Sequence, residues 1–218
     1  EMCIRDRDRG ARALGALRAM TAAGDFASLS DGETFLLLAA LVAVIGSILV
    51  TTLRTGVPPM PSNSHVAATM LALVPADTRG VIYELGAGWG GFAVRLAWRC
   101  PAARVIAYEL SPLPFIVAKA LQWLSRRRNL EVRYGNFMSR PLGDGAVVTC
   151  YLMIGAMVRL APKLRAELPA GALVVSNAFT LPDWPPERVV TVTAYQNTPV
   201  YLYRQPLAAQ EASATPVG

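Results

Sequence analysis

Residues 81–91 read VIYELGAGWGG, an apolar run that leads directly into four glycines. The apolar run predicts a buried strand, and residues 91–99 predict a helix. Glycine permits positive φ and lets a ligand approach the backbone, while the first N–H groups of a helix stay free for a polar or anionic ligand. The segment therefore predicts a strand, a ligand-binding turn and a helix.

The flanking sequence repeats this alternation. We expect further strands at 104–109, 130–134, 146–152 and 172–179, and helices at 112–127 and 156–168. Such a series predicts a parallel sheet with helices on both faces. Residues 189–194 and 200–204 are also strand-like, and the turn-rich YQNTP between them favours a hairpin. The expected fold class is α/β, with a Rossmann-like sheet that ends in an antiparallel hairpin.

One long apolar segment precedes this domain. Residues 34–53 read TFLLLAALVAVIGSILVTTL, twenty residues without a charge. As a helix they would reach about 30 Å, the thickness of the hydrocarbon core of a bilayer. A buried core helix usually keeps a polar stripe, and the apolar part of a signal peptide is shorter. We therefore expect one transmembrane helix at 34–53, which makes the lipid bilayer a partner of the chain.

The sequence divides into four further parts. Residues 1–33 are expected to be disordered and partly non-native, because their opening EMCIRDRDRG resembles translated adapter sequence. Residues 54–63 form a linker stiffened by three prolines. Residues 64–204 form the domain, and its first helix is expected to start at Ser62 or Ser64 as N-cap. Residues 205–218, rich in Ala, Pro, Ser and Thr, are expected to be disordered.

Charge and cysteine content argue against two kinds of site. The formal net charge is +6, but the arginines are spread out apart from residues 126–128 and a cluster near the N-terminus, so we expect no nucleic-acid partner. Cys3, Cys100 and Cys150 have no C-x-x-C spacing, and His65 is the only histidine. The sequence therefore predicts no metal site.

Two acidic residues stand where a nucleoside ligand would need them. Glu84 lies two residues before the first glycine, and Glu109 ends the next predicted strand, 19 residues past Gly90. A carboxylate in the second position can accept hydrogen bonds from both ribose hydroxyls. Dinucleotide-binding enzymes place an acid similarly, and the glycines also satisfy G-x-G-x-x-G. The two acids alone therefore leave S-adenosylmethionine and NAD open.

The pattern E-x-G-x-G-x-G, which begins at Glu84, resembles motif I of class I S-adenosylmethionine-dependent methyltransferases, whose sheet also ends in an antiparallel hairpin. The resemblance implies S-adenosylmethionine as the cofactor. It also implies that Asn136 binds the adenine amino group and that Phe137 lies against the ring. The implied cofactor-binding residues are Glu84, Gly86, Ala87, Gly88, Gly90, Glu109, Leu110, Asn136 and Phe137.

A narrower resemblance rests on the apolar span together with V-P-P-M-P-S, A-Y-E-L-S-P, G-N-F and S-N-A-F-T-L-P-D-W. Over residues 34–204 the chain looks like the family of ATP synthase c-subunit and adenine nucleotide translocase lysine methyltransferases, which has prokaryotic members. The resemblance implies methylation of a lysine on a membrane protein. The chain departs from the family where Glu84 and Trp89 replace aspartates, and where residues 151–155 replace G-V-P.

Sequence and resemblance together predict a membrane-anchored methyltransferase whose substrate is an integral membrane protein. A lysine must arrive neutral, and an apolar channel lowers its pKa. The candidate channel residues are Tyr151, Phe179 and Trp184, and the sequence names no catalytic residue. We expect a single-pass protein with its catalytic domain in the cytoplasm, which for a bacterial source means the inner membrane.

Three alternatives stay open at this point. The first is a methyltransferase of a membrane-dissolved quinone or lipid, which would use the same anchor and cofactor. The second is an NAD-dependent oxidoreductase. The third is a module that binds the cofactor without turnover.

Overall fold

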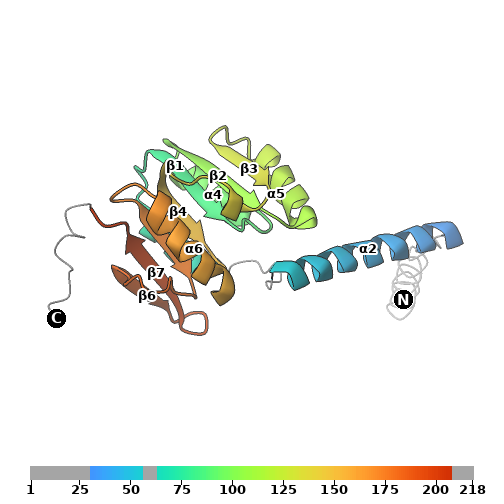
Figure 1. Cartoon of the computed structure of the whole chain (residues 1–218). Helices are drawn as coiled ribbons and strands as arrows, with labels where there is room; N and C mark the ends of the chain where they lie inside the picture. The colour runs from blue at the N-terminus through green and yellow to red at the C-terminus, as the bar shows by residue number, and fades with distance from the viewer. Residues whose placement is uncertain (1–29, 56–62, 208–218) are drawn as a thin grey trace, which may run out of the picture. The chain divides into compact units, whose positions relative to one another are not determined.

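The computed structural model of the chain describes residues 30–55 and 63–207 (Figure 1). Most of the expected N-terminal segment and of the proline-rich linker lies outside these residues. Both therefore stay predictions.

One long helix, α2 (Asp31–Thr55), covers the apolar segment. It begins with a capping box, in which the Ser30 N–H donates to the Glu33 carboxylate at 2.8 Å and the Glu33 N–H donates to the Ser30 hydroxyl at 3.3 Å. Large apolar side chains between Phe35 and Leu49 are exposed along the helix. In the part of the chain that the structure describes, no helix is long and apolar enough to cross a membrane, so the predicted transmembrane helix is not confirmed.

Residues 63–207 follow the predicted alternation of strand and helix. The elements are α3 (Ser64–Leu73), β1 (Gly80–Leu85), α4 (Gly91–Arg99), β2 (Ala103–Glu109), α5 (Pro112–Ser125), β3 (Leu130–Tyr134), the short 3-10 helix η1 (Phe137–Ser139), β4 (Gly145–Cys150), α6 (Ile154–Glu167), β5 (Leu173–Asn177), β6 (Arg188–Val192) and β7 (Thr198–Arg204).

The strands within residues 63–207 form one seven-stranded sheet in the order β3-β2-β1-β4-β5-β7-β6. The strands from β3 to β5 are parallel, and β7 is antiparallel to both β5 and β6. This confirms the predicted parallel sheet and its C-terminal hairpin. The strand order reverses between β1 and β4. Open α/β sheets bind their ligands at such a switch point, outside the carboxyl ends of the strands.

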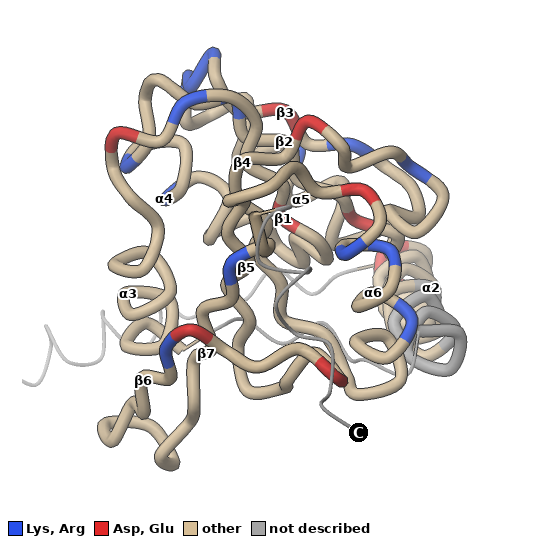
Figure 2. The backbone as a smooth tube through the Cα atoms, turned by 60° about the vertical axis from the view of Figure 1, so that its left-hand side comes forward, with Lys and Arg blue, Asp and Glu red and all other residues tan. Residues whose placement is uncertain are grey.

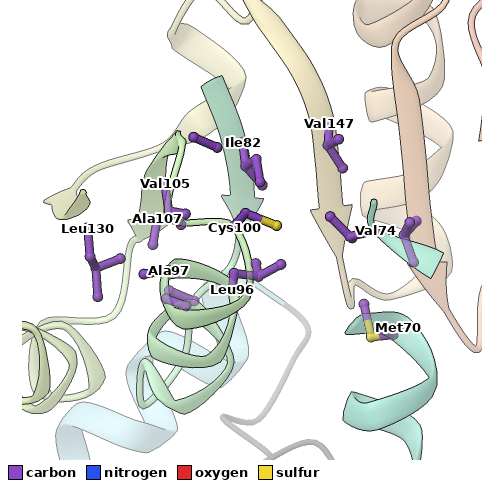
Figure 3. Packing of buried hydrophobic residues seen from close by; sticks show 14 of the residues in the cluster. Met70, Val74, Ile82, Leu96, Ala97, Cys100, Val105, Ala107, Leu130 and Val147 are labelled. Carbon is purple, nitrogen blue, oxygen red and sulfur yellow. The ribbon is translucent and has the colours of Figure 1, made fainter. Parts of the chain in front are cut away.

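Successive residues of the central strands face two separate cores. Ile82 and Val105 pack on the face that α3 and α4 cover (Figure 3), whereas Tyr83 and Ile106 pack on the face that α6 covers. All four side chains are buried. The alternation has the period of two that a strand imposes, and burial of both sets is typical of a parallel sheet between helical layers.

Two tyrosines, Tyr83 of β1 and Tyr108 of β2, pack on the sheet face that α6 covers. Tyr83 and Tyr108 stack with ring centroids 6.2 Å apart. The Tyr83 hydroxyl donates to Asp144 at 2.5 Å, and the Arg133 guanidinium donates to the Tyr108 hydroxyl at 3.2 Å. Both tyrosines are buried, and their hydroxyls have the polar partners that buried phenol groups need.

Several element boundaries differ from the expectation by one or two residues, and two of these differences bear on the cap of α3 and on the site. Asn63, rather than Ser64, caps α3 through its side-chain oxygen, because a short amide at this position reaches a free N–H of the first turn. Ser62 lies outside the described residues. β4 ends at Cys150, two residues earlier than expected, so Tyr151 belongs to the loop that follows the strand.

The beginning of the expected disordered tail is held in place. Gln205 is buried, its backbone N–H donates to the Ala172 carbonyl at 2.8 Å, and its side-chain amide donates to the Arg165 carbonyl at 2.9 Å. Ordered structure therefore extends past the predicted boundary at residue 204. Residues 208–218 lie outside the described part, and their disorder stays a prediction.

Candidate active site

A cavity of about 650 Å³ opens at the carboxyl edge of the parallel strands. Its wall comes from the glycine turn after β1, from the ends of β2 and β4, from the segment around η1 and from Phe179 after β5. Residues of α3 and α4 complete it from one helical layer, and residues of α6 from the other. The cavity thus lies at the switch point of the sheet.

The glycine turn is tied to the end of β2 by its own backbone. The N–H groups of Gly86 and Ala87 both donate to the Tyr108 carbonyl, at 3.0 and 2.9 Å. Gly88 has a φ of 54°, in the left-handed region that favours glycine, and open space lies where its side chain would begin. A ligand can therefore lie directly against the backbone at Gly88.

Gly90 contributes to packing against α5 and not to the wall of the cavity. A Cβ built on it would lie 2.7 Å from Cβ and 2.8 Å from Cα of Ala118 in α5. Gly90 also has a φ of 81° and caps α4. Eight of the nine predicted cofactor-binding residues line the cavity, and Gly90 is the one that does not. Its small size lets the glycine turn pack against α5.

Glu84 is a buried acid with unused hydrogen-bonding capacity. The residue is 5% exposed and lines the cavity, and its Oε2 has no hydrogen-bond partner among the described residues. Burial raises the pKa of Glu84 well above its ordinary value, and the nearby carboxylate of Glu109 raises it further. A buried oxygen without a partner is rare in a folded protein, and beside a cavity it points to a donor on a ligand.

Glu109 joins the glycine turn to the end of β2. One carboxylate oxygen accepts from the N–H of Gly88 at 2.7 Å, and the other accepts from the N–H of Ser111 at 2.7 Å. Each oxygen has a second lone pair, and Glu109 lines the cavity. The side chain can therefore hold the turn and still accept two hydroxyl hydrogens. The first of these tasks could not be read from the sequence.

Three predicted residues lie at the end of the cavity nearest β3. Leu110, Asn136 and Phe137 all line it, and Leu110 is 41% exposed. The Asn136 side-chain oxygen accepts from the N–H of Met138 at 2.9 Å and so caps η1. This bond fixes the amide and leaves its NH₂ group and one oxygen lone pair for a ligand.

The predicted acceptor channel is only partly assembled by the fold. Tyr151 and Phe179 both line the cavity, with ring centroids 6.5 Å apart and an interplanar angle of 16°. Trp184 does not reach it. Its ring is buried in the core cluster that includes α6, with its centroid 5.7 Å from that of Tyr203, and the guanidinium of Arg165 lies over the Trp184 ring at 5.6 Å. Trp184 therefore packs in the core, and its predicted role in the channel stays a prediction.

A tight turn at the end of β5 aims Phe179. The Phe179 N–H donates to the Asn177 carbonyl at 2.8 Å, and Ala178 between them has a φ of 63°. The Ser176 hydroxyl donates to the Phe179 carbonyl at 2.6 Å and closes the turn. A side chain with a Cβ rarely adopts such a φ, so this turn stores backbone strain beside the cavity. No sequence signal marked it, because Ala178 is neither glycine nor asparagine.

Two arginines that the sequence reading did not single out also line the cavity. Arg95 comes from α4 and Arg159 from α6. Neither has an ion-pair partner among the described residues. Their charges can accept a carboxylate, either from the amino-acid end of a cofactor or from an acceptor. Arg95 lies on the helix that begins at the glycine turn, and that position was the available signal.

Comparison with known proteins supports this assembly. Residues 84–188 match the family model described as the ANTKMT methyltransferase domain. The chain is 28% identical over 151 residues to a protein-lysine N-methyltransferase of Saccharolobus islandicus (strain REY15A), covering 67% of this chain and 92% of that protein. It is 31% identical over 139 residues to the adenine nucleotide translocase lysine N-methyltransferase of Mus musculus, covering 63% of this chain and 60% of the mouse protein.

A solved structure agrees with these matches. The crystal structure of an RNA methyltransferase from Salinibacter ruber, in complex with S-adenosyl-L-homocysteine, has a TM-score of 0.61 and 28% identity, and covers 73% of this chain and 98% of that chain. The chain is a class I S-adenosylmethionine-dependent methyltransferase. This confirms the predicted cofactor and the resemblance to the lysine methyltransferases. The NAD-dependent oxidoreductase and the module without turnover are thereby set aside.

The residues of this methyltransferase fit its cofactor. The unpartnered oxygen of Glu84 can accept from the amino group of the methionine part, and the two oxygens of Glu109 can accept from the ribose hydroxyls. The open backbone at Gly88 leaves room between them. Polar groups of the ligand can thus form hydrogen bonds with buried polar groups whose bonding capacity the protein itself does not use.

Proposed function

We propose that this methyltransferase modifies the side-chain nitrogen of a lysine in an integral membrane protein. Two relatives are named as lysine methyltransferases, and the matched family domain includes Glu84, Glu109 and the Tyr151–Phe179 pair. The observation that carries the proposal is this aromatic pair, which lines the cofactor cavity. Aromatic rings pack against the apolar stem of a lysine side chain and shield its nitrogen from water.

The residues around the cavity would align the two reactants. Bound S-adenosylmethionine supplies an activated methyl group, so the reaction needs in-line placement more than covalent catalysis. Glu84 and Glu109 would hold the amino-acid and ribose ends of the cofactor. Tyr151 and Phe179 would form an apolar wall, which lowers the pKa of an entering lysine because it disfavours the charged form. The lysine proton would leave to solvent.

Cys150 lies in the same wall but would not compete for the methyl group. Burial raises the pKa of its thiol to about 12. At neutral pH the side chain is therefore a neutral thiol, whereas the thiolate is the nucleophile. The sulfur lies 4.0 Å from that of Met157, and both contribute soft apolar surface.

We also propose that residues 34–53 anchor the enzyme in a lipid bilayer. The segment carries no charge, and the large apolar side chains of α2 are exposed. α2 ends at Thr55, and the six residues 56–61 that follow it include three prolines. A proline-rich linker of this length extends roughly 19 Å at about 3.1 Å per residue. A short tether raises the effective concentration toward acceptors in the same membrane and does little for soluble ones.

The proposed topology places the catalytic domain in the cytoplasm, where the methyl donor is made; for a bacterial source the anchor would lie in the inner membrane. Asp31 and Glu33 precede the apolar segment, and Arg54 follows it. A basic residue on the cytoplasmic side agrees with the positive-inside rule. A reporter fused to the C-terminus should be active in the cytoplasm, and activity confined to the periplasm would reverse the orientation.

The acceptor can be found with a labelled donor. Membranes from a strain that lacks the enzyme are incubated with the purified full chain and methyl-labelled S-adenosylmethionine, then fractionated into protein, extractable lipid and RNA. We expect the label on lysine of a membrane protein, and none with Glu109→Ala, which weakens the cofactor site. Label confined to a quinone or lipid, or to RNA, would contradict the proposal and leave the methyltransferase assignment standing.

A further inference from the structure

The side of α5 that faces away from the sheet is apolar. Ile116, Trp123 and Leu124 are 62%, 80% and 63% exposed, and Ala120 between them is exposed as well. These four residues, here called the α5 outer face, fall within about 100° of one another around the helix at 3.6 residues per turn. An apolar stripe of this width normally faces a protein core.

Two polar side chains of α5, Lys119 and Gln122, hydrogen-bond the backbone of β3. The Lys119 ammonium donates to the Val132 carbonyl at 3.1 Å, and the Val132 N–H donates to the Gln122 side-chain oxygen at 2.9 Å. Val132 belongs to β3, the edge strand, whose backbone groups would otherwise be open to a foreign strand. Lys119 and Gln122 cap this edge. Pro114 and Ala118 are the buried residues of α5, so the helix is apolar both toward the core and on its outer face.

A basic run follows the α5 outer face. Residues 126–128 are all arginine and connect α5 to β3, where the basic residues are drawn in blue (Figure 2). The guanidinium of Arg127 lies 3.5 Å from the ring centroid of Trp98, which is 60% exposed. Arg126 and Arg128 are exposed. An aromatic and basic border therefore adjoins the apolar stripe.

No acidic side chain offsets this border. Residues 110–134 contain five basic residues and one acidic residue, Glu131. Glu131 is already paired with Arg104 at 2.5 Å and with Arg133 at 2.7 Å. The surface around the α5 outer face therefore carries net positive charge.

We propose that the α5 outer face is a second membrane-contact surface, which enters the interfacial layer of an anionic bilayer while Arg126 and Arg128 bind lipid phosphates. Amphipathic helices with Trp and Leu on one side and basic residues beside them bind such membranes. A second copy of this chain would bring the same positive charge to the interface, so charge favours anionic lipid. The contact is distinct from the anchor at 34–53 and does not depend on which acceptor is methylated.

Lipid contact of Trp123 can be measured on the full chain. The protein is placed in nanodiscs of phosphatidylcholine alone or mixed with phosphatidylglycerol, with lipids brominated near the headgroup to quench tryptophan fluorescence. We expect stronger quenching in the anionic discs. Trp123→Phe should remove this extra quenching, because phenylalanine keeps the apolar contact but not the reporter. Trp98→Phe should retain most of it.

Charge reversal supplies the matched controls. Arg126→Glu with Arg128→Glu should lose the anion-dependent quenching of Trp123. Arg140→Glu with Arg188→Glu, the same change at two exposed positions elsewhere, should retain it. Cofactor binding by every variant checks that the domain is folded. Equal quenching of the wild type and Trp123→Phe overturns the proposal, and so does a dimer in which Trp123 is shielded from the bromine. Neither result involves methyl transfer, so the proposed function is tested separately.

Discussion

The carboxylate of Glu109 accepts the backbone N–H of Gly88 at 2.7 Å, so the acid at the end of β2 fixes the turn at the end of β1. The two residues are 21 positions apart in the chain. Because the same carboxylate faces the cavity, one side chain both shapes the turn and stays available to the ribose. Its removal should therefore affect cofactor binding through two routes.

Glu109→Ala should weaken S-adenosylmethionine binding by about 1.5–3 kcal/mol, or roughly tenfold to 150-fold in Kd, because charge-assisted hydrogen bonds are lost. Glu109→Gln, which keeps one acceptor oxygen, should lie between this variant and the wild type. Isothermal calorimetry measures all three. Glu187→Ala removes an exposed acid paired with Arg204 and serves as the control with unchanged binding. Wild-type affinity in Glu109→Ala would refute the assigned role.

Gly90→Ala should destabilise the fold by about 1–3 kcal/mol, because its Cβ would overlap Ala118 at 2.7 Å. Gly88→Ala shares the positive φ but meets open space, so it should cost about 1–2 kcal/mol in stability and impair cofactor binding more strongly. Urea unfolding gives the stabilities. Ala118→Gly should recover part of the loss in Gly90→Ala, and additive losses in the double variant would show that the overlap is not the cause.

Glu84 should make the stability of the ligand-free protein depend on pH. Burial, and then the charge of Glu109, raises the pKa of Glu84. An acid whose pKa is higher in the folded state stabilises the fold below its unfolded pKa, and this stabilisation is lost as the pH rises through the folded pKa. Glu84→Gln should therefore unfold at a higher temperature than the wild type at neutral pH, yet bind the cofactor more weakly.

Thermal unfolding from acidic to neutral pH tests this behaviour. The wild type should lose stability relative to Glu84→Gln as the pH rises, since only the wild type has the buried Glu84 carboxyl to ionise. Parallel curves for the two proteins would mean that the Glu84 carboxyl is not strained by burial in solution.

Phe179→Ala and Trp184→Ala should separate channel from core. Phe179 lines the cavity, so its loss should lower kcat/KM for the acceptor and leave the affinity for S-adenosylmethionine unchanged. Trp184 is buried against Tyr203, so its loss should cost about 3–5 kcal/mol of stability. Steady-state kinetics with the acceptor, measured at a temperature where both variants are folded, distinguish the channel role from the core role. The reverse pattern would restore Trp184 to the channel.

The sequence predicted those parts of the site that are formed by residues close together in the chain. The turn from Glu84 to Gly90 could be recognised because its strand, glycines and helix are contiguous. The contacts of Gly90 with Ala118 and of Trp184 with Tyr203 were not predicted, because these partners are distant in sequence. The strained φ of Ala178 also had no local signal.

The same distinction applies to the fold. Every strand from β1 to β7 was predicted, because each β-branched run is bounded by turn residues. The orientation of α5 was not predicted, because the sequence of an apolar helix does not show which of its sides packs against the domain and which side stays exposed. Burial of Pro114 and Ala118 and the bonds of Lys119 and Gln122 to Val132 fix that side, and these contacts arise only in the folded domain.

Mass spectrometry of digested membrane fractions, from cells with and without this enzyme, tests the central claim most directly. We predict at least one peptide of an integral membrane protein whose lysine is methylated only when the enzyme is present, and unmethylated when Glu109→Ala replaces it. Identical lysine methylation in both membranes, together with a methylated lipid or quinone that appears only with the enzyme, would contradict the account.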